Sequence, residues 1–154
     1  MTNTVIRIYY ENEEGQASVE SLICDSANDN LFEIIQIPLW AYSLSLEDVI
    51  ICSTDPLDIN ALSFEKHHHH SGNSTIQIVE LQKWGLFQII PNLESFLGKQ
   101  NIRFNSSSYI AINIPANVDY KPIKTFLQKY EDDEIISYKE AKIGQNHEYE
   151  GCYG

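Results

Sequence analysis

Four consecutive histidines, His67-His68-His69-His70, are the first residues in this sequence whose type suggests chemistry. Imidazole is a common ligand of zinc and nickel. Metal sites usually need ligands that converge from separate turns or elements, whereas consecutive residues of a strand point alternately to opposite faces. We therefore interpret the tract as a polar loop that binds such metals only adventitiously. The sequence predicts no dedicated metal site and no cofactor.

His147 and Cys152 lie close together in the sequence and could be imagined as a Cys/His nucleophilic pair. No orienting third group stands at a recognisable spacing, and such pairs are defined by geometry rather than by composition. The chain also lacks G-x-x-x-x-G-K, G-x-G-x-x-G, G-x-S-x-G and H-E-x-x-H, so neither a phosphate-binding loop nor a hydrolase signature is present. We expect that the protein is not an enzyme.

The run Glu131-Asp132-Asp133-Glu134 places four carboxylates directly after a predicted helix. Acidic residues at the C-terminal end of a helix interact unfavourably with its dipole, which suggests a use for them. They could face the Lys and Arg side chains of another protein, or they could form a solvated turn. The sequence leaves both interpretations open.

Charge is distributed unevenly along the 154 residues. Residues 1–65 contain Arg7 as their single basic side chain against twelve acids, residues 66–130 are net basic, and the formal charge of the whole chain is −12. A one-sided negative field repels nucleic acid and anionic membranes, and it attracts basic proteins. The alternative is that the acidity serves solubility alone.

The N-terminal part of the chain predicts a module of strands. Short β-rich segments are separated by turn clusters such as Asp25–Asn30, and none of them shows helical periodicity. This spacing predicts a small antiparallel β barrel or curled sheet over residues 1–66. The expected strands are residues 4–10, 17–24, 31–37, 48–53 and 61–66.

The C-terminal part changes character and predicts a β-α-β-β-α-β order, which is the ferredoxin-like pattern. Apolar residues at helical spacing predict a helix over residues 86–97, which Pro91 kinks or divides and Gly98 ends. A second helix has Asp119 as its cap and Pro122 in its first turn. The expected strands are residues 74–81, 102–105, 109–114 and 135–143.

We therefore predict an α+β protein with a β module at residues 1–66, an α+β module at 73–143 and a tail at 144–154. The chain is 43% apolar, which suffices for a packed core. It contains neither an apolar stretch of membrane-spanning length nor a secretory signal. Its three cysteines have no framework spacing, so we expect reduced thiols in a cytoplasmic protein.

Two segments resemble a bacterial family of small proteins catalogued as a domain of unknown function. The first runs from Ile37-Pro38 through Ala41 and Ser45 to Asp48-Val49-Ile50, and the second is Ser71-Gly72-Asn73-Ser74-Thr75. The resemblance covers most of residues 17–143. The chain departs from the family pattern at three positions. Ser43 and Glu47 stand where glycine is usual, and Gln77 stands where a basic residue is common.

Small acidic proteins without catalytic motifs are similar in kind to the immunity proteins encoded beside bacterial toxins. We therefore expect an antitoxin that occludes the active site of a basic nuclease, such as an RNase of a contact-dependent growth inhibition or polymorphic toxin system. The alternative is a sensor or regulatory module that binds a small molecule. The oligomeric state stays open. The residues expected to contact the partner are the loop acids Glu11, Glu13, Glu14, Asp29, Asp55, Asp58, Glu131, Asp132, Asp133 and Glu134.

Overall fold

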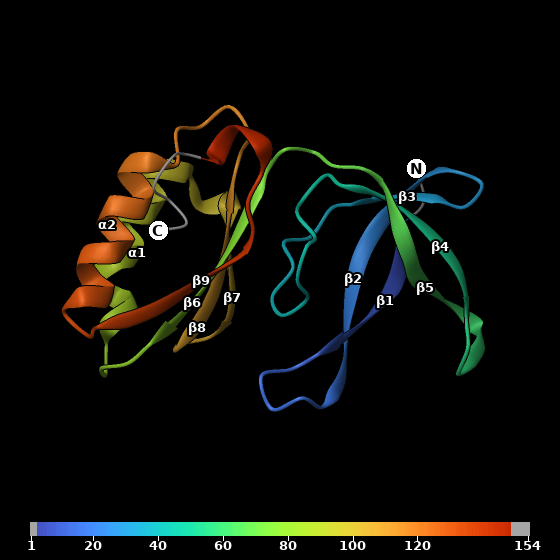
Figure 1. Cartoon of the computed structure of the whole chain (residues 1–154), viewed down its shortest axis with the longest axis horizontal. Coiled ribbons are helices and arrows are strands. Elements are labelled where there is room, and N and C mark those ends of the chain that lie inside the picture. The colour runs from blue at the N-terminus through green and yellow to red at the C-terminus, as the bar shows by residue number, and fades with distance from the viewer. Residues whose placement is uncertain (1–2, 149–154) are drawn as a thin grey trace.

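The computed structural model describes residues 3–148, which form a β barrel and a second sheet covered by two helices (Figure 1). The predicted mixed α+β class is therefore confirmed. Five strands close the barrel in the order β1-β2-β3-β4-β5. The barrel strands are β1 (Asn3–Glu11), β2 (Ala17–Asn28), β3 (Leu31–Ile34), β4 (Val49–Asp55) and β5 (Asp58–His69).

The barrel is not antiparallel throughout, because β1 closes it by pairing with β5 in parallel. The other neighbouring strands are antiparallel. Alternate residues of each strand point inward, as period-two alternation requires. Together with Ala41 and Leu44 of the segment between β3 and β4, they form an apolar interior of Ile6, Ile8, Leu22, Cys24, Phe32, Ile34, Ile50 and Cys52. Cys24 and Cys52 are free thiols, and burial raises the pKa of each to about 12, so both stay protonated and unreactive.

The second sheet has four antiparallel strands in the order β7-β8-β6-β9. Both helices cover one face of this sheet, and its other face is turned toward the barrel (Figure 1). The elements are β6 (Ser74–Glu80), α1 (Gly85–Leu97), the 3-10 turn η1 (Lys99–Asn101), β7 (Ile102–Ser106), β8 (Tyr109–Ile114), α2 (Lys121–Asp132), β9 (Ile136–Lys142) and the 3-10 turn η2 (Gln145–His147). No helix within residues 3–148 has the length and apolar character needed to cross a membrane.

Each helix buries its apolar face against the sheet. Leu86, Ile89, Leu93 and Leu97 of α1 pack with Ile123 and Leu127 of α2 in one core that also contains the β6 and β8 isoleucines. Pro91 lies inside α1 without dividing it, and Gly98 ends the helix at a φ of 84°, where a Cβ is disfavoured. The residue at the N-cap of α2 is Tyr120 rather than the predicted Asp119.

A long loop between β3 and β4 lies between the barrel and the open face of the sheet (Figure 1). Its Ile37 and Leu39 pack against Ala111 of β8. Two of its residues, Ser43 and Glu47, adopt left-handed backbone conformations with φ of 64° and 69°. These are the positions where the resembling family has glycine, and glycine enters this conformation without a steric cost. Ser43 and Glu47 therefore keep the same loop conformation at the cost of backbone strain.

Two further predictions about local structure are wrong. The strand predicted over residues 31–37 ends at Ile34, because the chain then enters the inter-module loop. The histidine tract is not a loop, because His67, His68 and His69 end the long strand β5. Within the segment predicted as a tail, His147 is buried, and its ring nitrogens lie 2.6 Å from Ser74 Oγ and 2.8 Å from the Val118 carbonyl oxygen.

Candidate binding cleft between barrel and sheet

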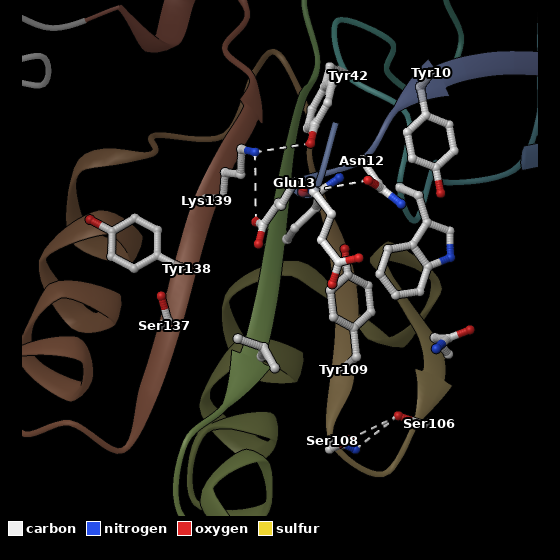
Figure 2. A pocket seen from close by; sticks show the side chains of 15 residues that line it. Tyr10, Asn12, Glu13, Tyr42, Ser106, Ser108, Tyr109, Ser137, Tyr138 and Lys139 are labelled. Atoms are coloured by element: carbon white, nitrogen blue, oxygen red, sulfur yellow. Dashed lines mark hydrogen bonds and ion pairs between the residues drawn. The ribbon is translucent and has the colours of Figure 1, made fainter. Parts of the chain in front are cut away.

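A cleft of about 610 Å³ separates the β1–β2 hairpin from the open face of the sheet. Its walls come from the barrel, the β3–β4 loop and strands β6 to β9, so both modules contribute to it. Figure 2 shows Tyr10 on the barrel side, Tyr109 on the sheet side, and Ser106 and Ser108 where β7 turns into β8. The volume lies within the range of roughly 300–1,000 Å³ that is usual for ligand sites.

The inner wall of the cleft is a pair of stacked rings. The rings of Trp40 and Tyr109 are 4.2 Å apart between centroids and inclined by 12°. The Tyr109 hydroxyl donates to the carbonyl oxygen of Leu39, which holds the ring of β8 against the β3–β4 loop. Burial raises the pKa of Tyr109, so its hydroxyl stays a neutral donor. Trp40 keeps 38% of its surface exposed, and it offers this surface to the cleft.

Glu20 is the buried group that positions Trp40. Its carboxylate accepts hydrogen bonds from the backbone N–H groups of Leu39, Trp40 and Ala41, at 2.7, 2.9 and 2.9 Å. Arg103 of β7 lies 3.6 Å from the same carboxylate and donates to the Ile37 carbonyl oxygen at 2.7 Å. Three backbone donors and one guanidinium satisfy this buried charge. The loop therefore holds its aromatic side chain in a fixed place.

A cation already lies over one aromatic face of the cleft. The Lys139 ammonium is 4.2 Å from the centroid of the Tyr42 ring and 3.2 Å from its hydroxyl oxygen. The same ammonium is 4.0 Å from Glu13 Oε1 (Figure 2). A cation over a ring face with a carboxylate beside it is a favourable arrangement. This part of the cleft therefore has chemistry suited to positive groups.

The hairpin between β1 and β2 brings Glu13 and Glu14 to the rim of the cleft. The side-chain carbonyl of Asn12 accepts from the backbone N–H groups of Glu14 and Gln16, at 3.0 and 2.9 Å, which closes the turn locally. Gly15 completes it with a φ of 77°. Both glutamates are exposed, and among the described residues the Glu14 carboxylate forms no ion pair. The rim therefore carries more negative than positive charge.

Gln77 lies at the back of the cleft with an unsatisfied donor. Its side chain projects from the face of β6 opposite the helices, and it is only 8% exposed. Its Nε2 atom is shielded from solvent and has no hydrogen-bond partner among the described residues. An unpaired buried amide costs free energy, and such groups are rare in folded proteins. If the Gln77 side chain turns its amide toward the cleft, an acceptor from a bound molecule removes that cost.

The structure places the predicted contact acids in several separate locations. Glu13 and Glu14 line the cleft, and Glu11 is exposed at the end of β1 beside them. Asp29 lies in the β2–β3 turn, at the opposite end of β2 from the hairpin. Glu131 and Asp132 end α2, and Asp133 and Glu134 follow in the turn to β9, on the side of the sheet that the helices cover (Figure 1). The ten acids therefore do not form one surface.

Two of the predicted acids serve the barrel itself. Asp55 is 1% exposed, and its carboxylate accepts from the Tyr9 hydroxyl at 2.8 Å and from the Leu57 backbone N–H at 2.7 Å. Arg7 lies 3.8 Å from Asp55 and 3.4 Å from Asp58. Burial removes Asp55 from any partner surface, and Asp58 is half-buried in the same turn. The turn residues around Asp55 and Asp58 suggested an exposed loop. In the structure the two carboxylates instead stabilise this turn and its contact with β1.

Two residues of the histidine tract converge with a carboxylate. Ligand atoms of Asp48, His67 and His70 all lie within 4.8 Å of one another, a spacing at which a metal ion could be held. The Lys142 ammonium stands among them, 2.5 Å from Asp48 Oδ2 and 2.7 Å from His70 Nδ1. Asp48 also accepts from the Ser45 and Ser71 backbone N–H groups. The cation that this group accommodates is therefore the chain's own lysine.

This cluster seals one end of the contact between barrel and sheet. The Thr75 hydroxyl of β6 lies 2.8 Å from Ser45 Oγ and donates to the Leu44 carbonyl oxygen at 3.0 Å. The Ser43 N–H donates to the Ala141 carbonyl oxygen at 3.1 Å. We call Asp48, Lys142, Ser45 and Thr75 the latch. The latch fixes the barrel against the sheet, so the two walls of the cleft keep a constant relative position.

The remaining predicted chemistry can also be located. His147 is held by Ser74 and Val118, which is a structural role, whereas Cys152 lies outside the described residues, so the Cys/His pair is not tested. The sequence interpretation missed Glu20, Gln77 and Lys139. The single signal available for them was that Gln77 departs from the family pattern.

Fold and cleft together define an α+β protein in which a closed β barrel and a helix-covered sheet enclose a cleft. The family comparison is more specific. Residues 20–138 match the model of the domain of unknown function DUF4265, so the chain belongs to that family. It is similar to a hypothetical protein from Neisseria gonorrhoeae of known crystal structure, with 31% identity, a TM-score of 0.77, and coverage of 94% of this chain and 97% of that one. No curated protein matches the chain.

Proposed function

We propose that the chain is an immunity protein that binds a basic toxin, most simply a nuclease, and blocks its active site. One observation carries this proposal: the aromatic cleft has two exposed carboxylates on its rim, and Lys139, the cation that lines it, already contacts one of them. Aromatic anchors inside a charged rim are the usual anatomy of a tight protein interface. The excess of negative charge speeds the approach of a basic partner.

The proposal includes a ferredoxin-like assignment for the module from β6 to β9. The strand order β7-β8-β6-β9, with both helices on one face, supports that assignment. A fold of this kind leaves one sheet face uncovered. In this chain the barrel and the cleft occupy that face, and this supports a proposed contact surface at the junction of barrel and sheet.

The test compares two double charge reversals that change net charge equally. Glu13→Lys/Glu14→Lys alters the cleft rim, whereas Asp132→Lys/Asp133→Lys alters exposed acids at the far side of the helical layer. Wild type and both variants are used as bait in lysate of the source organism at low salt and at ~0.5 M salt, because high salt screens surface attraction. A basic protein that wild type retains is then co-expressed with each version, and growth is measured.

We expect wild type and the distant variant to retain this protein and restore growth, and the rim variant to lose both. Equal losses in the two variants would mean that only the overall field matters. If wild type retains no basic protein, or if the retained protein is not toxic, the immunity proposal fails.

A second candidate function is a sensor that binds a small molecule, and the unpaired Gln77 amide favours it. A metabolite that binds the folded state alone raises its melting temperature by mass action. The expected result is a rise for wild type in a metabolite panel and a smaller rise for Gln77→Leu. An equal rise in both would place the metabolite elsewhere.

A further inference from the structure

We infer that the occupant of the cleft is an arginine-bearing loop of a polypeptide, whose main-chain carbonyl accepts a hydrogen bond from Gln77. This inference rests on the proposed function and names the chemistry that the cleft recognises. Three features of the described residues carry it: the charge of the rim, the aromatic faces, and the unpaired amide at the back.

The rim and the rings select a cation. Glu13 and Glu14 project from the hairpin, and the Glu14 carboxylate has no ion-pair partner among residues 3–148. Lys139 already demonstrates the arrangement, because its ammonium lies 4.2 Å from the Tyr42 centroid and 4.0 Å from Glu13 (Figure 2). A guanidinium is planar, binds a carboxylate through two N–H groups and stacks on aromatic rings. Arginine therefore fits this end of the cleft better than a second lysine.

The amide at the back requires an acceptor. Gln77 Nε2 can only donate, and an arginine side chain has no acceptor to offer it. A free polyamine has none either, so it would leave the buried amide unpaired. A nucleotide has acceptors, but its phosphates would meet Glu13 and Glu14. A peptide loop provides both parts, because it carries main-chain carbonyls on the same molecule as the guanidinium.

The cleft can be tested with three matched probes and one fluorescent reporter. The chain contains two tryptophans, so Trp84→Phe leaves Trp40 as the single indole, and Trp84 is exposed away from the lining residues. The probes are acetyl-Gly-Arg-Gly-amide, the same peptide with citrulline in place of arginine, and agmatine. Citrulline keeps the shape and the carbonyls but has no charge. Agmatine keeps the guanidinium but has no carbonyl.

We expect the arginine peptide to change Trp40 fluorescence saturably and to shift the Gln77 side-chain amide resonance. The citrulline peptide should bind about tenfold more weakly, since it loses the charged contacts. Agmatine should leave the Gln77 resonance in place. In Gln77→Leu the arginine peptide should bind about fivefold more weakly, which corresponds to one hydrogen bond.

Equal binding of the arginine and citrulline peptides, or binding that leaves the Gln77 resonance unmoved, would overturn the inference. A lack of saturable binding by every probe would overturn it as well. These outcomes are separable from the proposed function, which the growth assay tests on its own. Peptide binding without neutralisation would refute immunity alone. Full neutralisation by Gln77→Leu, without peptide binding, would refute the arginine loop alone.

Discussion

Thr75 and Gln77 lie two residues apart on the same face of β6, and both face the barrel, yet their surroundings differ. The Thr75 hydroxyl is enclosed in the latch and has two partners. The Gln77 amide is also buried, but its Nε2 has no partner among the described residues. The contact region between barrel and sheet thus has a closed end at Thr75, where the polar groups are paired, and an open end at Gln77, where the amide is unpaired. The difference indicates where the region serves cohesion and where it can serve a ligand.

The same contrast separates two lysine–carboxylate pairs that join the modules. Lys142 and Asp48 are 2.5 Å apart, with 10% and 0% of their side chains exposed. Lys139 and Glu13 are 4.0 Å apart, with 48% and 84% exposed. Removing one partner of a buried pair leaves an uncompensated charge in the interior, whereas an exposed pair is solvated with or without its partner. The first pair should therefore matter for folding and the second for binding.

The largest expected effect is the loss of the latch in Asp48→Ala. It leaves the Lys142 ammonium buried and the N–H groups of Ser45 and Ser71 without their acceptor, so the free energy of unfolding should fall by about 3–5 kcal/mol. Glu13→Ala is the matched control, and its cost should stay below about 1 kcal/mol. Urea unfolding of both variants gives the comparison. Similar costs in the two would contradict the division into closed and open ends.

The next effect concerns Glu20, whose carboxylate holds the β3–β4 loop at Trp40. The same loop carries Ser45 and Asp48 of the latch. Glu20→Gln replaces one acceptor oxygen by a donor beside three backbone N–H groups, so unfolding should become easier by about 2–3 kcal/mol. Trp40 should become more mobile, and its emission in the Trp84→Phe background should shift to the red. Glu65→Gln, on an exposed position of β5, is the control. Unchanged Trp40 emission would show that the loop does not need this carboxylate.

A third effect follows from His67, which faces His70, Lys142 and Asp48 at the latch. Burial, together with the nearby charges of His70 and Lys142, lowers the pKa of His67 below its usual 6.5, and Asp48 opposes this only partly. The unfolded chain therefore binds more protons than the folded one just below pH 6.5. Stability should be fully present above about pH 6.5 and should decline as the pH falls toward the lower folded-state pKa.

His67→Leu should flatten that decline, whereas His68→Ala, on the exposed neighbour, should leave it unchanged. The measurement is the free energy of unfolding in urea between pH 5 and 8. An identical pH profile for wild type and His67→Leu would remove His67 as the source of the dependence.

The elements of both modules could be predicted from the sequence, because they rest on local periodicity. Alternation along residues 74–80 and helical spacing from Leu86 to Leu97 were sufficient to place β6 and α1. The cleft could not be predicted in this way. Lys139 and Tyr42 are 97 positions apart, and no local pattern indicates that they meet.

The dependence on contacts between distant residues also explains why the sequence does not reveal which acids are buried. Asp55 and Glu20 are both carboxylates in acidic surroundings, and nothing in their neighbours distinguishes them from exposed ones. Their burial depends on which strands close the barrel and on where the β3–β4 loop crosses it. By contrast, the sequence alone marks Ser43 and Glu47 as departures from family glycines. Their positive φ values give that departure a physical meaning.

The smallest expected changes in the free energy of unfolding come from Thr75→Val and Gln77→Leu, which compare the closed and open ends of the contact region most directly. Thr75→Val leaves the Leu44 carbonyl and the Ser45 hydroxyl without their partner, so it should cost about 1–2 kcal/mol. Gln77→Leu removes an amide that is already unpaired, so it should be neutral or should stabilise the fold by up to about 1 kcal/mol. Urea unfolding of the two variants, two residues apart on one strand, gives the difference directly. If Gln77→Leu were as costly as Thr75→Val, Gln77 would have a partner inside the fold, and the open end of the contact region would not be waiting for an acceptor from another molecule.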